Sequence, residues 1–105
     1  MPTIEDALSY LGIDYPDAVV RRNVTRALAT AIKTLHGAVG EDVDELLPND
    51  ERATELVLIY LDDLYSARGV SAKVSGSTRQ LVHTMELQLT LELRAARAAK
   101  EVSSV

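Results

Sequence analysis

Residues 52–69 are the feature that most constrains this chain, because their apolar residues repeat with the period of an α-helix. The apolar face consists of Ala53, Leu56, Val57, Tyr60, Leu61, Leu64 and Tyr65. Leu58 and Ile59 lie off that face, so the helix is apolar nearly all round for about two turns. Such a helix is central in a core or contacts a second molecule. We therefore expect an assembly module rather than an enzyme, with Leu58 and Ile59 as candidate subunit-interface residues.

The composition fits one small domain. The chain has 105 residues, of which 47% are hydrophobic, so one modest core is feasible. The absence of cysteine excludes disulfides, thiolate metal sites and a cysteine nucleophile. No secretory signal is visible at the amino terminus. The longest apolar run, residues 56–61, is far shorter than the roughly twenty residues that cross a bilayer. We therefore expect no membrane partner and a cytoplasmic location.

The net charge of −5 argues against a simple nucleic-acid binder, whose affinity comes mostly from cations that neutralise phosphates. A negative lining is nevertheless compatible with a protein that surrounds DNA without gripping it.

Capping and turn residues divide the chain into four expected helices, which predicts an all-α fold: a small four-helix bundle with a long C-terminal helix. The expected helices are residues 4–11, 14 or 17 to 36, 49 or 50 to 68, and about 78–100. The expected caps are Thr3 with Asp6, Asp14 or Asp17 with Pro16 near the first turn, and Asn49 or Asp50. The expected helix ends are Gly12, Gly37 and Gly69.

Three segments between and after these helices are expected to be irregular. Residues 38–49 form an acidic loop closed by Pro48, and residues 101–105 are expected to fray. Residues 70–77 are small and polar, which predicts a mobile loop that docks a partner. Its candidate docking residues are Val70, Lys73 and Val74.

The second expected helix has two sharply different faces. Val20, Val24, Ala27, Leu28, Ala31, Ile32 and Leu35 cluster on one side, and Arg22, Arg26, Lys33 and His36 lie almost opposite. The cationic side is either a solvated surface or a stripe that meets an acidic partner. One candidate acidic partner is the loop with Glu41, Asp42, Asp44 and Glu45, within the same subunit or in a neighbouring one.

Residues 85–93 alternate apolar and polar side chains, which is the pattern of a half-buried strand. Their Leu, Met, Glu and Gln composition favours a helix instead. As a helix, this segment has one apolar stripe through Val82, Met85, Leu89, Leu93 and Ala96, and another through Leu87, Leu91 and Ala98. The second stripe is a candidate subunit interface, unless the helix is sandwiched inside its own domain.

Residues with catalytic or metal-binding patterns are nearly absent. The sequence has no phosphate-binding glycine loop, no zinc-protease motif and no nucleophile elbow. His36 and His83 stand alone, and Asp62 and Asp63 do not face each other on a helix. We therefore expect no catalytic residue, no metal site and no cofactor.

The order of these segments resembles the small head-to-tail connector (adaptor) proteins of tailed bacteriophages and prophages. Tyr10, Leu11, Ile13 and Asp14 match that family's first helix, where Gly12 replaces the common basic residue; Leu64, Tyr65 and Arg68 match the end of its third. The resemblance covers about residues 4–94, including the leucine-rich residues 87–94.

The resemblance implies a non-enzymatic virion protein, made in the bacterial host cytoplasm. About twelve copies would form a ring beneath the portal protein, with two complementary patches on each subunit. The ring would extend the DNA channel, through which DNA passes without specific binding, and would dock a tail or stopper protein. Two rival functions stay open: a helical regulatory or antitoxin-like oligomer, which would need a basic recognition helix, and a small all-α enzyme, which would need polar residues inside the bundle.

Overall fold

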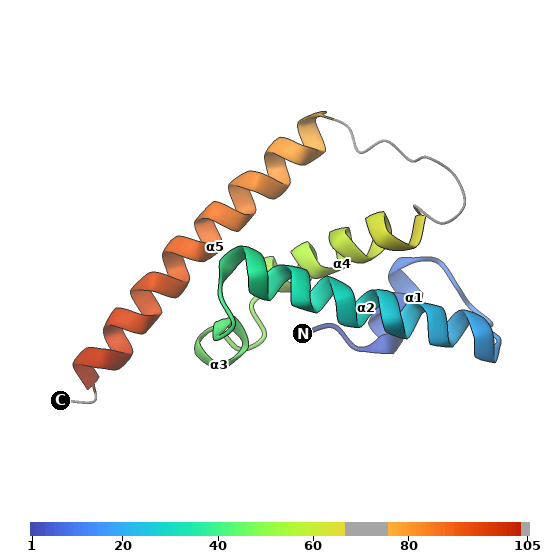
Figure 1. Ribbon diagram of the computed structural model, residues 1–105, viewed down its shortest axis with the longest axis horizontal. Coiled ribbons are helices and arrows are strands. Elements are labelled where there is room, and N and C mark those ends of the chain that lie inside the picture. The colour runs from blue at the N-terminus through green and yellow to red at the C-terminus, as the bar shows by residue number, and fades with distance from the viewer. Residues whose placement is uncertain (67–75, 104–105) are drawn as a thin grey trace.

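A computed structural model describes residues 1–66 and 76–103, and all regular structure within those ranges is helical (Figure 1). The helices are α1 (Ile4–Tyr10), α2 (Ala18–Val39), α3 (Val43–Leu46), α4 (Glu51–Ser66) and α5 (Gly76–Ser103). The all-α fold with a long C-terminal helix is thus confirmed, with the four-residue α3 as an addition.

The expected helix starts follow from side-chain caps. Thr3 accepts a hydrogen bond from the backbone N–H of Asp6 at 3.2 Å, and the Asp6 carboxylate accepts one from the N–H of Thr3 at 2.9 Å. This reciprocal capping box begins α1 as predicted. Asp17, rather than Asp14, caps α2, and Pro16 lies directly before that cap, near the first turn. Asp50, rather than Asn49, accepts a bond from the N–H of Ala53 at 3.0 Å at the start of α4.

The predicted end of the second helix at His36 is wrong. Gly37 lies inside α2, which continues to Val39 and ends at Gly40, where φ is 144°. Val39 lies four residues after the buried Leu35 and is itself buried, so the apolar stripe continues one more turn. That burial offsets the cost of a glycine within the helix. The predicted loop 38–49 therefore includes the end of α2 and the whole of α3.

The two ends of α5 lie outside the expected range of about 78–100. The helix begins at Gly76, within the expected loop 70–77, and continues to Ser103, within the expected tail 101–105. Residues 85–93 lie inside it, so the helical interpretation of the alternating segment is confirmed. The predicted end of α4 at Arg68 and Gly69, and the docking residues Val70, Lys73 and Val74, lie outside the described residues.

The core lies mainly between α2 and α4, which run in opposite directions, and α1 covers one side of the pair (Figure 1). It is built almost wholly from aliphatic side chains because the chain has no Phe or Trp. The buried hydrophobic residues are Ala7, Leu8, Val24, Leu28, Ala31, Leu35, Val39, Val43, Ala53, Leu56, Val57, Leu61, Leu89 and Leu93.

The long helix α5 crosses one end of this pair and extends well beyond it in both directions (Figure 1). Among the α5 side chains whose burial is described, residues 79–102, only Leu89 and Leu93, both in its middle, are fully buried against the other helices. The radius of gyration is 15.3 Å, whereas a compact domain of this size has about 13 Å. The extended shape leaves most of the α5 surface uncovered.

Candidate subunit interface

Two basic residues near the end of α5 bind the acidic segment around α3. The Arg97 guanidinium donates to both carboxylate oxygens of Asp42, from Nε at 2.7 Å and from Nη2 at 2.5 Å. Lys100 donates from Nζ to Glu45 at 2.8 Å. The hydrogen bonds from Arg97 hold the pKa of the Asp42 carboxyl below its ordinary value. A paired guanidinium and carboxylate fix orientation as well as distance, so Asp42 positions the end of α5.

Two side-chain hydrogen bonds between described residues join α5 to α4. Arg52 donates from Nη1 to Glu92 at 2.7 Å, and the Tyr60 hydroxyl donates to the Glu86 carboxylate at 2.5 Å. Burial raises the pKa of Tyr60, and the bond to Glu86 raises it further. Tyr60 is thus half-buried against the core, with its hydroxyl bonded to Glu86 of α5.

Most acidic side chains of this segment have an ion-pair partner within the subunit. Asp42 and Glu45 bind α5, and His36 Nε2 lies 2.9 Å from the carboxylate of Asp44, while Glu41 is exposed. Of the predicted cationic stripe, only His36 reaches these acids, because it lies in the last turn of α2 beside α3. Among the described residues, the side chains of Arg22, Arg26 and Lys33 form no ion pair.

The second apolar stripe of α5 lies on the surface. Leu87 and Leu91 are 57% and 53% exposed, whereas Leu89, between them in sequence, is 0% exposed. Leu81, Ala98 and Val102 are exposed as well. The alternative that α5 is sandwiched inside its own domain is therefore wrong for this face, which remains a candidate interface.

The two candidate interface residues of α4 differ from each other. Leu58 is half-buried and packs against the core, so part of its surface is already used within the subunit. Ile59 is also half-buried, but it does not pack on the core cluster. Ile59 is thus the better placed of the two for contact with another molecule.

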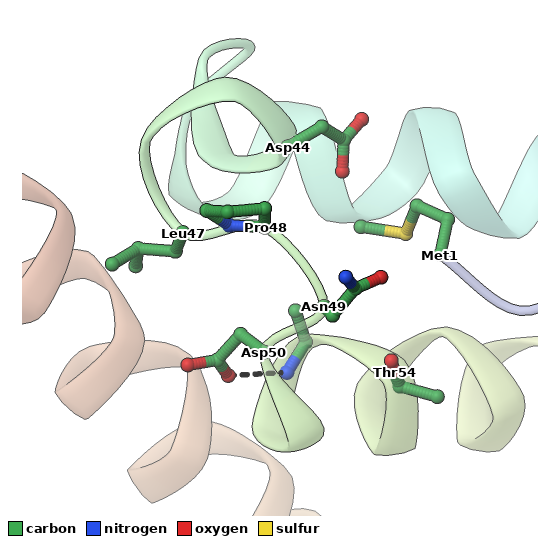
Figure 2. Close-up of a pocket in the computed structure, with 8 residues that line it drawn as sticks. Met1, Asp44, Leu47, Pro48, Asn49, Asp50 and Thr54 are labelled. Atoms are coloured by element: carbon green, nitrogen blue, oxygen red, sulfur yellow. Dashed lines mark hydrogen bonds between the residues drawn. The ribbon is translucent and has the colours of Figure 1, made fainter.

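Three hollows among the described residues have volumes of about 100, 190 and 520 Å³, and the last is lined by Arg79, Gln80, His83 and Thr84 of α5. One, of about 100 Å³, lies between the N-terminal segment, α3 and the start of α4, lined by Met1, Asp44, Asn49 and Thr54 among others (Figure 2). The nearby Asp50 already accepts the capping hydrogen bond of α4. No group of three or more metal-binding side chains occurs within the described ranges. No helix of those same ranges is long and apolar enough to span a membrane.

Comparisons of the chain with protein-family models, with curated proteins and with solved structures give no match. The exposed surfaces of the molecule therefore carry the evidence for its function. Sequence reasoning did not single out Arg97 and Lys100, which hold the acidic segment. Their partners lie 55 residues away in the chain, and a helix-face pattern carries no signal for such pairs.

Proposed function

We propose that this protein is a non-enzymatic structural subunit that assembles into a ring through α5. The observation that carries the proposal is the exposed apolar strip formed by Leu87, Leu91, Ala98 and Val102. Of the eight exposed large hydrophobic side chains among the described residues, four lie on α5: Leu81, Leu87, Leu91 and Val102. Concentration of apolar surface on one element is typical of a protein interface.

The length of the strip supports assembly rather than a small-molecule site. From Leu87 to Val102 it runs for about 22 Å along the helix, at about 1.5 Å per residue. The strip lies on the convex surface of a helix, whereas binding sites for small molecules are concave. A straight, exposed helix face of this length matches the face of another helix.

By its resemblance to head-to-tail connector proteins, the ring would lie in the virion between the portal and the tail or stopper. DNA would pass through its centre without specific binding. The net charge of −5 favours such a channel, because cations that neutralise phosphates would slow the passage of DNA.

Native mass spectrometry and negative-stain electron microscopy of the purified protein test the proposal. We expect closed rings, since a head-to-tail contact that closes on itself gives cyclic symmetry, and the resemblance to connector proteins implies about twelve subunits. A protein that stays monomeric at all accessible concentrations, or that forms open filaments, contradicts it. The neighbouring genes give an independent test, because portal and major capsid genes directly upstream are expected for a connector.

A further inference from the structure

The outer side of α2 carries cations that have no partner among the described residues of the subunit. Arg22, Arg26 and Lys33 are exposed, and their side chains form no hydrogen bond or ion pair with the described residues. Val24 lies two residues before Arg26, about 200° around the helix, and is buried against the core. This cationic face, defined as Arg22, Arg26 and Lys33, therefore lies on the side of α2 opposite Val24, with Arg26 at its edge, where it lines a hollow of about 190 Å³ with Leu64 and Tyr65 of α4.

The outer side of α4 carries the opposite charge. Glu51, Glu55 and Asp62 are exposed and lie within about 40° of one line along the helix. The buried Ala53 and Val57 are each about 200° from Glu55, so this acidic ridge points away from α2. Burial is the main cause of the raised pKa of the nearby Tyr10. The negative charges of Glu55 and Asp62 raise that pKa further, as expected beside concentrated negative charge.

The two charged surfaces thus lie on opposite sides of the α2–α4 pair. A ring requires two different, complementary patches on each subunit, one for each neighbour. A patch pair on opposite sides of one subunit has the placement that such a head-to-tail contact needs. The acidic segment around α3 is less suited to this role, because Asp42, Asp44 and Glu45 are already paired.

The charges also match in spacing. Within a subunit α2 and α4 run in opposite directions (Figure 1), and the rotation of about 30° between neighbours in a ring of about twelve changes that relation by no more than about 30°. With Lys33 level with Glu51, Arg22 falls level with Asp62, since both pairs span eleven residues. Arg26 then lies three residues, or about 4.5 Å along the axis, from Glu55, within reach of a long side chain.

We propose that the cationic face of α2 binds the acidic ridge of α4 in a second copy of this chain. This inference rests on the proposed ring and adds a charged contact between its subunits to the contact made by the apolar strip of α5. It stands on the pairs Lys33 with Glu51 and Arg26 with Glu55, because Asp62 has a further interaction within its own subunit. In the same register Ile59 lies level with Thr25, an exposed residue beside the cations.

Charge reversal on each surface tests the inference. Lys33→Glu and Glu51→Lys each place like charges against each other, so each raises the concentration for half-maximal assembly by about tenfold. Mixing the two variants restores assembly, because each altered surface then meets an opposite charge on the other variant. The double variant Lys33→Glu/Glu51→Lys assembles alone for the same reason. Sedimentation velocity measures all four samples, and Arg79→Glu, a reversal at an exposed residue outside both surfaces, is the matched control.

Each outcome decides the question. Restored assembly in the mixture and in the double variant supports the contact, since damage within one subunit could not be repaired by mixing. If the wild type forms rings but the single variants assemble normally, or the mixture is not restored, the inference fails and the proposed ring stands. If the wild type forms no oligomer, both the inference and the proposed function fail.

Discussion

Gly40 controls how closely α5 approaches the rest of the molecule. Its φ of 144° lies where side chains are rarely accommodated, and a Cβ there would lie 2.8 Å from Leu93 Cδ2 and even closer to Arg97. Gly40→Ala therefore strains the backbone and displaces both α5 side chains. We expect the free energy of unfolding to fall by about 1–3 kcal/mol, measured by urea denaturation followed by circular dichroism.

Gly37→Ala is the matched control for that experiment. Gly37 lies inside α2, and a Cβ added there meets nothing within 4 Å. Replacing it with alanine should raise the free energy of unfolding by about 0.5–1 kcal/mol, because glycine is a poor helix former. A loss of stability at Gly37 together with no loss at Gly40 would show that α2 ends at the earlier glycine.

Asp42 makes the attachment of α5 sensitive to acid. Its pKa is lowered in the folded protein from an ordinary value of 3.8 by the hydrogen bonds from Arg97. A lowered pKa means that the stabilisation is present above about pH 3.8 and is lost as the pH falls through the folded value. Asp42→Asn removes this contribution, so the variant should be less stable than the wild type at neutral pH. Thermal denaturation at a series of pH values should show the two proteins converging below pH 3.8, and a constant difference between them would contradict the assignment.

Among the helices, α5 carries two groups of leucines that differ in exposure. Leu87 and Leu91 are more than half exposed, and Leu89 and Leu93 are buried. Leu87→Glu/Leu91→Glu should therefore keep the helical circular dichroism of the wild type but abolish oligomers in sedimentation. Leu89→Ala, the control, should instead lower the free energy of unfolding by about 2–5 kcal/mol. Unfolding of the double glutamate variant would place Leu87 and Leu91 in the core and end the interface assignment.

Sequence periodicity predicted most of these elements because the helix faces are set by local spacing. The buried positions of α2 and α4, the capping box at Thr3 and the two faces of α5 all follow from residues within a few turns of one another. The end of α2 was missed because Gly37 and Gly40 are equally plausible terminators locally. The buried Val39, one turn after Leu35, was the signal that distinguished them.

The partners of the acidic segment could not be predicted from the same reasoning. Arg97 and Lys100 meet Asp42 and Glu45 only because α5 folds back across the end of α2. A helix-face pattern shows that a charge is exposed, but not which distant charge it meets. For that reason the sequence left open whether the acids bind the cationic stripe, and the structure pairs them mostly with α5 instead.

At the scale of the whole molecule, two kinds of surface would hold the proposed ring together, and salt affects them differently. The apolar strip of α5 depends on the burial of leucine side chains, which salt does not weaken. The cationic face of α2 and the acidic ridge of α4 are exposed, and exposed charges are screened over about 10 Å at 0.1 M salt. The salt response of assembly therefore reports the charged contact separately from the apolar one.

We expect wild-type assembly to require a higher protein concentration as sodium chloride rises from about 0.05 to 0.5 M, because each exposed pair is worth only about 0–1 kcal/mol but recurs at every contact. Sedimentation equilibrium across the salt series measures the effect. A variant with Arg22, Arg26 and Lys33 all changed to glutamine is the control: it should assemble more weakly at low salt and respond little to added salt. Circular dichroism over the same range should be constant, since the aliphatic core stabilises the subunit independently of salt. Wild-type assembly that is indifferent to salt would remove the charged surfaces from the interface and leave the apolar strip of α5 as its basis.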